Sequence, residues 1–390
     1  MKYNFDQPTN RRNTDSIKWD VKDNELPLWI ADMDFETAPA VKQALTTRVS
    51  TGIYGYTEPN DDWYNAYINF YKDRYAVEFK KEELMFCLGV VPAISSSVRK
   101  ITKEGDNVVI LSPVYNIFYN SIINNNRKIL EVPLLIIGDE YKIDFENLEK
   151  AFALENTTMM IFCNPHNPIG KIWTKDELER IGSLAKKYNV VVLSDEIHAY
   201  LTRPNKSYIP YLSVNETNKG NSITCISVTK AFNLAGIHTS CIVVPNKDLF
   251  KRVNRQINTD EVAEPNIFSC PAAIAALNES RDWLDELREI LFRNRDIVDD
   301  FIKKNIPCLH SIPGDATYLL WIDCSKLGDS KEYVDYLREK TGLFVTDGSV
   351  YGKGGHGYFR MNVATQESTL QDALERLKAG TASYIKEYNL

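Results

Sequence analysis

Short apolar runs alternate with amphipathic stretches through the middle of the chain. Continuous β-branched and other apolar runs are typical of strands that are buried on both faces. Six such runs occur, at 83–88 (ELMFCL), 107–111 (NVVIL), 158–163 (TMMIFC), 189–194 (NVVVLS), 223–227 (ITCIS) and 240–244 (SCIVV). Residues 174–188 place apolar side chains on one helical face, and Thr174 with Glu177 forms a capping-box signature at the start. Strands that alternate with helices in this way predict an α/β fold with a mainly parallel sheet flanked by helices.

The pattern changes beyond about residue 281, where charged helical segments begin. Two further strand-like runs follow, at 316–322 (ATYLLWI) and 357–363 (GYFRMNV). This part predicts a smaller α+β domain, which the segment before the main sheet is expected to join. We therefore predict an N-terminal arm with a segment of the small domain over residues 1–45. A large domain over 46–285 and a small C-terminal domain over 286–390 complete the prediction.

Composition narrows the class of protein. The net charge of −7, without clusters of basic residues, argues against a nucleic-acid surface or an anionic membrane as partner. No stretch approaches the ~20 apolar residues of a membrane-spanning helix, and the polar residues 1–20 do not resemble a signal peptide. The seven cysteines lack any CxxC pair, so we expect reduced, mostly buried thiols, no metal site and a cytoplasmic protein.

Candidate chemistry follows five of the predicted strands, at the sheet edge where parallel α/β folds bind ligands. The features are an anion-binding turn at 89–92, an aromatic ring at Tyr115, an amide at Asn167, a carboxylate at Asp195 and an amine at Lys230. Each feature alone has an ordinary explanation, such as a helix start, a turn or a solvated lysine. Together they match pyridoxal phosphate, which needs a lysine for its aldehyde, an acid for its ring nitrogen and amides for its phosphate.

Several motifs that span most of the chain carry a family resemblance. They are 29–35 (WIADMDF), 54–59 (YGYTEP), 89–94 (GVVPAI), 112–118 (SPVYNIF), 163–173 (CNPHNPIGKIW), 193–201 (LSDEIHAYL), 227–236 (SVTKAFNLAG) and 358–362 (YFRMN). With these motifs the chain resembles the fold-type I pyridoxal-phosphate enzymes of the class I/II aminotransferase superfamily. More narrowly, it resembles the MalY/PatB-type cystathionine β-lyases, which are C–S lyases.

The resemblance implies a role for each matching residue around the cofactor ring. Lys230 binds the cofactor aldehyde and later moves the Cα proton of the substrate. Asp195 pairs with the ring nitrogen, and Tyr115 stacks on the ring. Asn167 donates to the 3′-oxygen and lies beside the substrate, and His198 occupies a place near the same oxygen.

The resemblance also implies a phosphate site. The backbone amides of Val90 and Val91 and the hydroxyls of Ser227 and Thr229 hold the phosphate. Tyr56 reaches it from a neighbouring subunit, which implies a homodimer with shared active sites.

For the substrate, the resemblance implies that Arg360 clamps the α-carboxylate, for which a bidentate guanidinium is well shaped. The backbone of Ala31 and Asp32 lies beside that carboxylate. His238 stands where aminotransferases of this superfamily usually place an arginine on the phosphate, which favours the lyase subgroup. The alternative for His238 is an ordinary packed or solvated histidine.

We therefore predict α,β-elimination from L-cystathionine or a related thioether amino acid, giving pyruvate, ammonia and a thiol. The nearest alternative is transamination on the same scaffold; no second arginine for a side-chain carboxylate is evident, which disfavours an aspartate-type aminotransferase. A regulatory protein built on this fold is a weaker alternative, because only about 45 residues precede the main sheet and a DNA-binding domain would need more.

Overall fold

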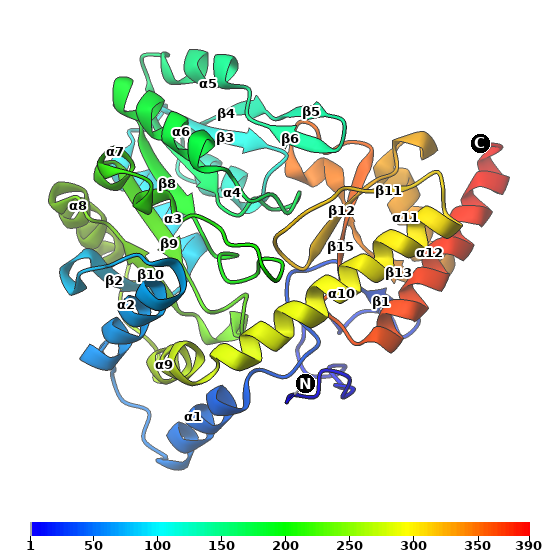
Figure 1. The fold of residues 1–390 in the computed structure, drawn as a ribbon, viewed down its shortest axis with the longest axis horizontal. Helices are drawn as coiled ribbons and strands as arrows, with labels where there is room; N and C mark the ends of the chain where they lie inside the picture. Colours follow the sequence, from blue (N-terminus) through cyan, green and yellow to red (C-terminus); the bar gives the residue numbers. More distant parts are fainter. Residues whose placement is uncertain (1) are drawn as a thin grey trace.

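The computed structural model describes residues 2–390. The largest sheet among these residues has seven strands (Figure 1). The strand order is β2-β10-β9-β8-β7-β3-β4. The bounds are β2 (Leu84–Cys87), β3 (Asn107–Ser112), β4 (Lys128–Pro133), β7 (Thr157–Cys163), β8 (Val191–Asp195), β9 (Ser222–Ile226) and β10 (Ser240–Val243). All neighbouring strands are parallel except β10, which is antiparallel to both β2 and β9. The mainly parallel sheet and all six predicted strands are confirmed.

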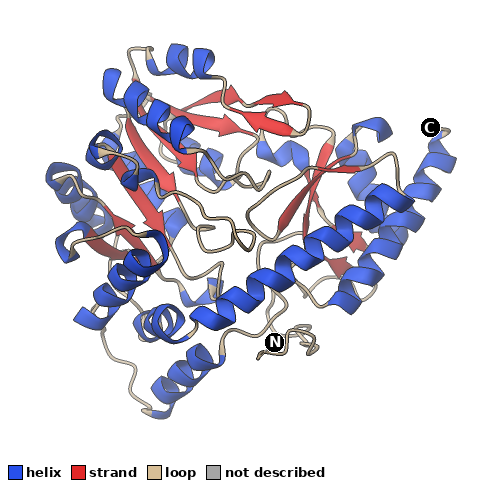
Figure 2. Ribbon diagram, viewed as in Figure 1, coloured by secondary structure: helices blue, strands red, loops and turns tan. Residues whose placement is uncertain are grey.

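Helices cover both faces of this sheet, which explains why its strands are apolar throughout (Figure 2). On one face, α3 (Val90–Ile101), α4 (Ile117–Ile123) and α8 (Lys247–Thr259) contribute to one apolar cluster. On the other face, α5 (Phe145–Phe152) and α6 (Lys175–Lys187) contribute to another, and α7 (Glu216–Gly220) packs on α6. The predicted capping box is present, since Thr174 and Glu177 each bond the other's backbone N–H.

A second sheet of four strands lies near the C-terminus, in the order β11-β12-β15-β14. Its strands are β11 (His310–Ser311), β12 (Leu319–Asp323), β14 (Thr346–Asp347) and β15 (Tyr358–Asn362). Helices α11 (Ser330–Thr341) and α12 (Glu367–Tyr388) pack against each other beside it, and the long α10 (Arg281–Asn305) runs along it from the large sheet (Figure 1). The strand-like runs near residues 316 and 357 are thereby confirmed as β12 and β15.

The N-terminal part reaches across to this second sheet. Strand β1 (Leu26–Pro27) pairs in parallel with β13 (Leu343–Phe344), and Thr346 Oγ1 donates to the Trp29 carbonyl oxygen at 2.7 Å. The remaining elements are α1 (Pro39–Ser50), α2 (Asp61–Tyr75) and α9 (Ser269–Glu279), which pack together, and the hairpin of β5 (Leu135–Ile137) and β6 (Glu140–Lys142). The division at residues 45 and 285 stays a prediction.

Three negative findings concern residues 2–390. No helix there is long and apolar enough to cross a membrane. No cluster of His, Cys, Asp or Glu in that range could hold a metal ion. The seven cysteines are free, and all but the half-buried Cys308 are buried, as expected for reduced thiols.

Candidate active site

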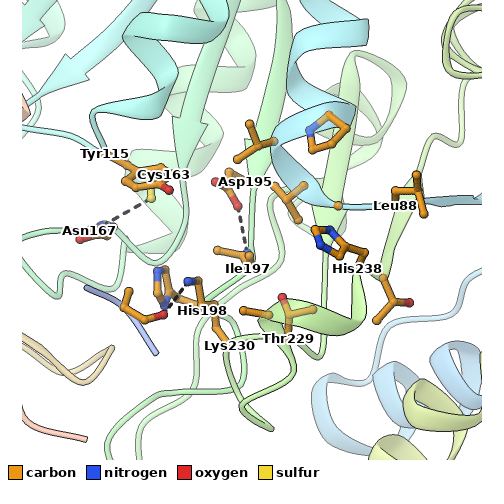
Figure 3. Close-up of a pocket in the computed structure, with 17 residues that line it drawn as sticks. Leu88, Tyr115, Cys163, Asn167, Asp195, Ile197, His198, Thr229, Lys230 and His238 are labelled. Atoms are coloured by element: carbon orange, nitrogen blue, oxygen red, sulfur yellow. Dashed lines mark hydrogen bonds between the residues drawn. The ribbon is translucent and has the colours of Figure 1, made fainter. Parts of the chain in front are cut away.

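A cavity of about 270 Å³ opens at one edge of the large sheet (Figure 3). It lies beyond the carboxyl ends of β2, β3, β7, β8 and β9 and at the amino end of the antiparallel β10, so all six strands deliver residues to one place. Ten predicted site residues line it, namely Ala31, Val90, Val91, Tyr115, Asn167, Asp195, His198, Thr229, Lys230 and His238. Residues that are 200 positions apart in the chain thus face one ligand-sized space.

Lys230 follows β9, and its Nζ donates a hydrogen bond to the carbonyl oxygen of Ala31 at 2.6 Å (Figure 3). The pKa of Lys230 is lowered to about 8, first by burial and then by the positive charge of Arg360, while Asp32 and Asp195 oppose the shift. An amine with this pKa has a neutral fraction near pH 7. Lys230 can therefore serve as a nucleophile or a base.

Asp195 ends β8 and is buried beside the cavity, where its Oδ1 accepts a hydrogen bond from the Ile197 amide at 3.1 Å. Burial raises the pKa of Asp195 to about 7, and the positive charge of Lys230 only partly opposes this. A buried carboxyl with one backbone donor is a good partner for a cationic ligand group. A protonated ring nitrogen is such a group.

The opposite end of the cavity is suited to an anion. Helix α3 begins there at Val90, with Gly89 as its N-cap and no side-chain cap, so its first amides are available to a ligand. Thr229 adds a hydroxyl from the loop after β9 that carries Lys230, here called the lysine loop. Thr239 adds another, whose buried Oγ1 has no hydrogen-bond partner within residues 2–390. Amides and hydroxyls around one point are what a phosphate needs.

Tyr115, Asn167 and His198 also line the cavity, and Asn167 contacts Arg360 of the second sheet. Burial raises the pKa of Tyr115 to about 12, so its ring stays neutral. Burial, with the positive charges of Lys230 and Arg360, lowers the pKa of His198 to about 3. His198 is therefore a neutral imidazole, and its Nδ1 has no partner among the described residues.

Arg360 lies just outside the lining and is buried on β15. Its Nη1 donates to Oδ1 of Asn167 at 3.3 Å, and its Nη2 donates to the Trp29 carbonyl oxygen at 2.9 Å. The guanidinium also lies over the ring of Tyr351, 5.1 Å from the ring centre. This places a positive charge beside the Asn167 end of the cavity, as the predicted carboxylate clamp requires.

Three other predicted residues do not line the cavity. Ser227 lies behind Thr229, where its Oγ is 2.8 Å from Thr229 Oγ1 and donates to the Thr239 carbonyl oxygen at 2.7 Å. The Asp32 carboxylate pairs with Arg11 at 2.7 Å, whereas the prediction for Asp32 concerned its backbone. Tyr56 is fully exposed on the surface. Their predicted contacts with phosphate and substrate stay predictions.

The sequence reasoning missed Thr239, Cys163 and Ile197, which also line the cavity. Thr239 directly precedes the apolar run of β10, so it could have been found had the reversed direction of that strand been predicted. Cys163 ends β7, and its Sγ accepts a hydrogen bond from the Asn167 amide at 3.4 Å. It was assigned only to the general set of buried thiols.

Comparison with known proteins identifies the family. Residues 24–377 match the family described as "Aminotransferase class I and II". The chain belongs to this family. It is 36% identical to the "Cystathionine beta-lyase PatB" of Bacillus subtilis, over 96% of this chain and 99% of the relative. The predicted resemblance is therefore confirmed.

Two solved structures of the family share the whole fold. Cystalysin from Treponema denticola, which contains pyridoxal 5′-phosphate, is 33% identical and superposes with a TM-score of 0.95 over 98% of this chain and all of that one. A pyridoxal-phosphate-bound putative aminotransferase from Clostridium difficile is 36% identical, with a TM-score of 0.94 over 97% and 100%. The predicted fold class is confirmed.

Pyridoxal 5′-phosphate is the cofactor of the family, and the residues of this cavity suit it. The unpartnered Thr239 hydroxyl and the free amides of α3 suit its phosphate. The buried Asp195 suits its ring nitrogen, and the amine of Lys230 suits its aldehyde. The cofactor prediction is confirmed, whereas the role of each single residue stays a proposal.

Proposed function

We propose that this protein is a pyridoxal-phosphate-dependent C–S β-lyase. It cleaves the Cβ–S bond of L-cystathionine or a related thioether amino acid and yields pyruvate, ammonia and a thiol. The observation that carries this proposal is the 36% identity to a cystathionine β-lyase over nearly the full length of both chains. The cavity supports it, because it combines a base, a buried acid and a neighbouring arginine.

Pyridoxal phosphate, when bound, supplies the electron sink for the pair left at Cα after that carbon loses its proton. The chain supplies the proton acceptor, since the neutral amine of Lys230 takes the Cα proton. Asp195, as a carboxylate, keeps the ring nitrogen protonated by charge pairing. The electrons then expel the thiolate from Cβ of the substrate, and the released product hydrolyses to pyruvate and ammonia.

Arg360 and Asn167 orient the substrate. The guanidinium binds the α-carboxylate through charge-assisted hydrogen bonds, and its bond to Asn167 Oδ1 ties this clamp to the cavity. Tyr115, which lines the cavity, would stack on the ring of the bound cofactor, and the neutral His198 adds no positive charge beside Lys230. A substrate held both by Arg360 and by the cofactor has its Cα–H bond fixed relative to Lys230. This orientation raises the rate more than it raises the affinity for the substrate.

The test is incubation of the cofactor-loaded protein with L-cystathionine, without any keto acid, while pyruvate, ammonia and homocysteine are assayed together. We expect all three in equal amounts over many turnovers. If turnover requires a keto-acid acceptor and releases no ammonia, the protein is an aminotransferase and the proposal is wrong.

Replacing Arg360 with alanine should lower kcat/KM for L-cystathionine by roughly 10- to 150-fold. This range corresponds to the loss of a charge-assisted carboxylate interaction of about 1.5–3 kcal/mol. Arg360→Lys keeps the charge but loses the planar pair of donors, so it should recover only part of the loss. Steady-state kinetics on proteins matched for cofactor content measures both, and an alanine variant with wild-type kcat/KM would remove Arg360 from the site.

We further propose that the working unit is a homodimer in which Tyr56 contacts the phosphate of the partner's site. The motivating observation is that Tyr56 is fully exposed, and that Ile53 and Tyr54 beside it are also largely exposed. A contiguous exposed apolar stretch is typical of an interface. Sedimentation should give a dimer, and a fully active monomer would contradict the proposal.

Tyr56→Phe should weaken retention of the cofactor about fivefold, which corresponds to one hydrogen bond of about 1 kcal/mol. Tyr54→Phe is the matched control, because the Tyr54 hydroxyl donates to the Val49 carbonyl oxygen of its own chain at 3.2 Å. Cofactor loss during dialysis, followed by absorbance, measures both. Equal retention in the two variants would place the Tyr56 hydroxyl away from the phosphate.

A further inference from the structure

A short stretch of backbone, residues 29–35, touches both Lys230 and Arg360. The Ala31 carbonyl oxygen accepts from Lys230 Nζ at 2.6 Å, and the Trp29 carbonyl oxygen accepts from Arg360 Nη2 at 2.9 Å. The proposed base and the proposed carboxylate clamp are therefore held two residues apart on one chain segment. We call it the 29–35 segment.

Asn233 ties the 29–35 segment to the lysine loop. Its Nδ2 donates to the carbonyl oxygens of Met33 at 3.0 Å and Phe35 at 2.8 Å, and its Oδ1 accepts from the Met33 amide at 3.1 Å. Asn233 lies three residues after Lys230 and has a φ of 55°, a left-handed conformation that asparagine tolerates better than most residues. Its side chain thereby makes three hydrogen bonds to the segment.

Asn362 makes the equivalent connection to the arginine strand. Its Nδ2 donates to the carbonyl oxygens of Ile30 and Asp32, both at 2.7 Å. It is fully buried and lies two residues after Arg360, so both side chains leave the same face of β15. Asn362 thus binds the carbonyl oxygens of residues 30 and 32 from β15, and Asn233 binds those of residues 33 and 35 from the lysine loop.

The segment keeps its place independently of Lys230. The Tyr318 hydroxyl also donates to the Ala31 carbonyl oxygen, at 3.0 Å. Lys18 Nζ pairs with the Asp34 carboxylate at 2.9 Å, and both side chains are almost fully buried. The acceptor for Lys230 therefore remains in position when the lysine moves.

We propose that the 29–35 segment sets the spacing between Lys230 and Arg360, and that Asn233 and Asn362 are positioning residues that act through it. The inference rests on the proposed function, in which Lys230 takes the Cα proton from a substrate whose carboxylate Arg360 binds. An amine that donates one N–H to a fixed carbonyl has a restricted lone-pair direction. Misplacement of a reacting group by about 1 Å can cost as much as 100-fold in rate.

The kinetic test compares Asn233→Gly, Asn362→Ala and the double variant in the full-length, cofactor-loaded protein. Glycine is used at position 233 because it accepts the positive φ without strain. Each single variant should lower kcat/KM for L-cystathionine about tenfold. The double variant should lose clearly less than the product of the two, because both act through one segment.

Asn294→Ala is the matched control. Asn294 Nδ2 also donates to two alternate carbonyl oxygens, those of Val363 and Thr365, both at 2.9 Å, but these lie outside the segment. This variant should stay within about twofold of wild-type kcat/KM. Losses in the segment variants no larger than in Asn294→Ala, at matched thermal stability, would overturn the proposal.

A second measurement uses the apoprotein and needs no catalysis. Reductive methylation of Lys230 across pH, followed by peptide mass spectrometry, gives the midpoint of its titration. Asn233→Gly should lower this midpoint by about 0.5 pH unit or more, because the Ala31 carbonyl oxygen that accepts from the ammonium is then held less firmly. Simple loosening would raise labelling at every pH without moving the midpoint, and that result would also overturn the proposal. If L-cystathionine gives no pyruvate but the midpoint moves, the lyase proposal fails and the role of the segment stands.

Discussion

Replacing Lys230 with alanine is expected to lower the rate of pyruvate formation from L-cystathionine by at least about 10⁴-fold. In the proposed mechanism the residue combines two tasks, attachment of the cofactor aldehyde and removal of the Cα proton, and general-base catalysis alone contributes up to about 10⁴-fold. Its pKa of about 8 and its position over the cavity equip it for both. Single-turnover kinetics with purified variant and wild type measures the loss.

A chemical experiment tests the same residue independently of activity. Borohydride treatment of the wild-type protein should attach the cofactor to the peptide that contains Lys230, and Lys230→Ala should show no attachment. Lys247→Ala, at the exposed start of α8, is the control and should label like wild type. Attachment at any other lysine would contradict the assignment.

Replacing Asp195 with asparagine is expected to lower kcat by about 10²- to 10³-fold. Asparagine preserves the shape of the side chain but removes the negative charge that, in the proposed mechanism, keeps the ring nitrogen protonated. Loss of one preorganised electrostatic partner of this kind costs about 2.7–4 kcal/mol. Wild-type kcat in a variant with full cofactor content would mean that Asp195 does not face the ring nitrogen.

Although Asp195→Asn should lower kcat, it should raise the free energy of unfolding of the apoprotein at pH 8. Burial raises the folded-state pKa of Asp195 from 3.8 to about 7. Its favourable contribution is therefore complete below pH ~4 and is lost as pH rises toward and through 7, where the buried carboxyl must ionise. Asparagine stays neutral, so apo Asp195→Asn should be more stable than the wild-type apoprotein at pH 8, by on the order of 4 kcal/mol.

Denaturant unfolding of both apoproteins at pH 5 and pH 8 measures this dependence. The stability difference should be clearly smaller at pH 5. The neighbouring Glu196 is also buried and has a raised pKa, but it is present in both proteins and its contribution cancels. A stability difference that does not change with pH would show that Asp195 is already charged in the folded apoprotein.

Local pattern was enough to predict the strands of the large sheet, because strands buried on both faces are apolar at every position. The exception is β4, which reads KILEVP and was missed. It is an edge strand whose side chains are mostly half-buried or exposed, so its run contains charged residues. Strand β2 at the other edge is fully buried and kept its apolar pattern, so the partial exposure of β4, and not its edge position alone, explains why it was missed.

The sequence by itself determined which residues follow each buried strand, and parallel pairing then places Tyr115, Asn167, Asp195 and Lys230 at one edge of the sheet. The direction of β10 is a different matter, since apolar runs look the same in either orientation. Only the fold shows that β10 is reversed, which brings the residues before it, His238 and Thr239, into the cavity.

The tertiary structure alone decided how the 29–35 segment joins Lys230 to Arg360. The hydrogen bonds that hold it link residues about 200 and 330 positions apart, through side-chain amides and backbone carbonyls. Every residue has a backbone carbonyl, so no local pattern marks the ones that will accept such bonds. Which side chains donate to these carbonyl oxygens depends on how the second sheet packs against the large one, and that packing depends on the whole chain.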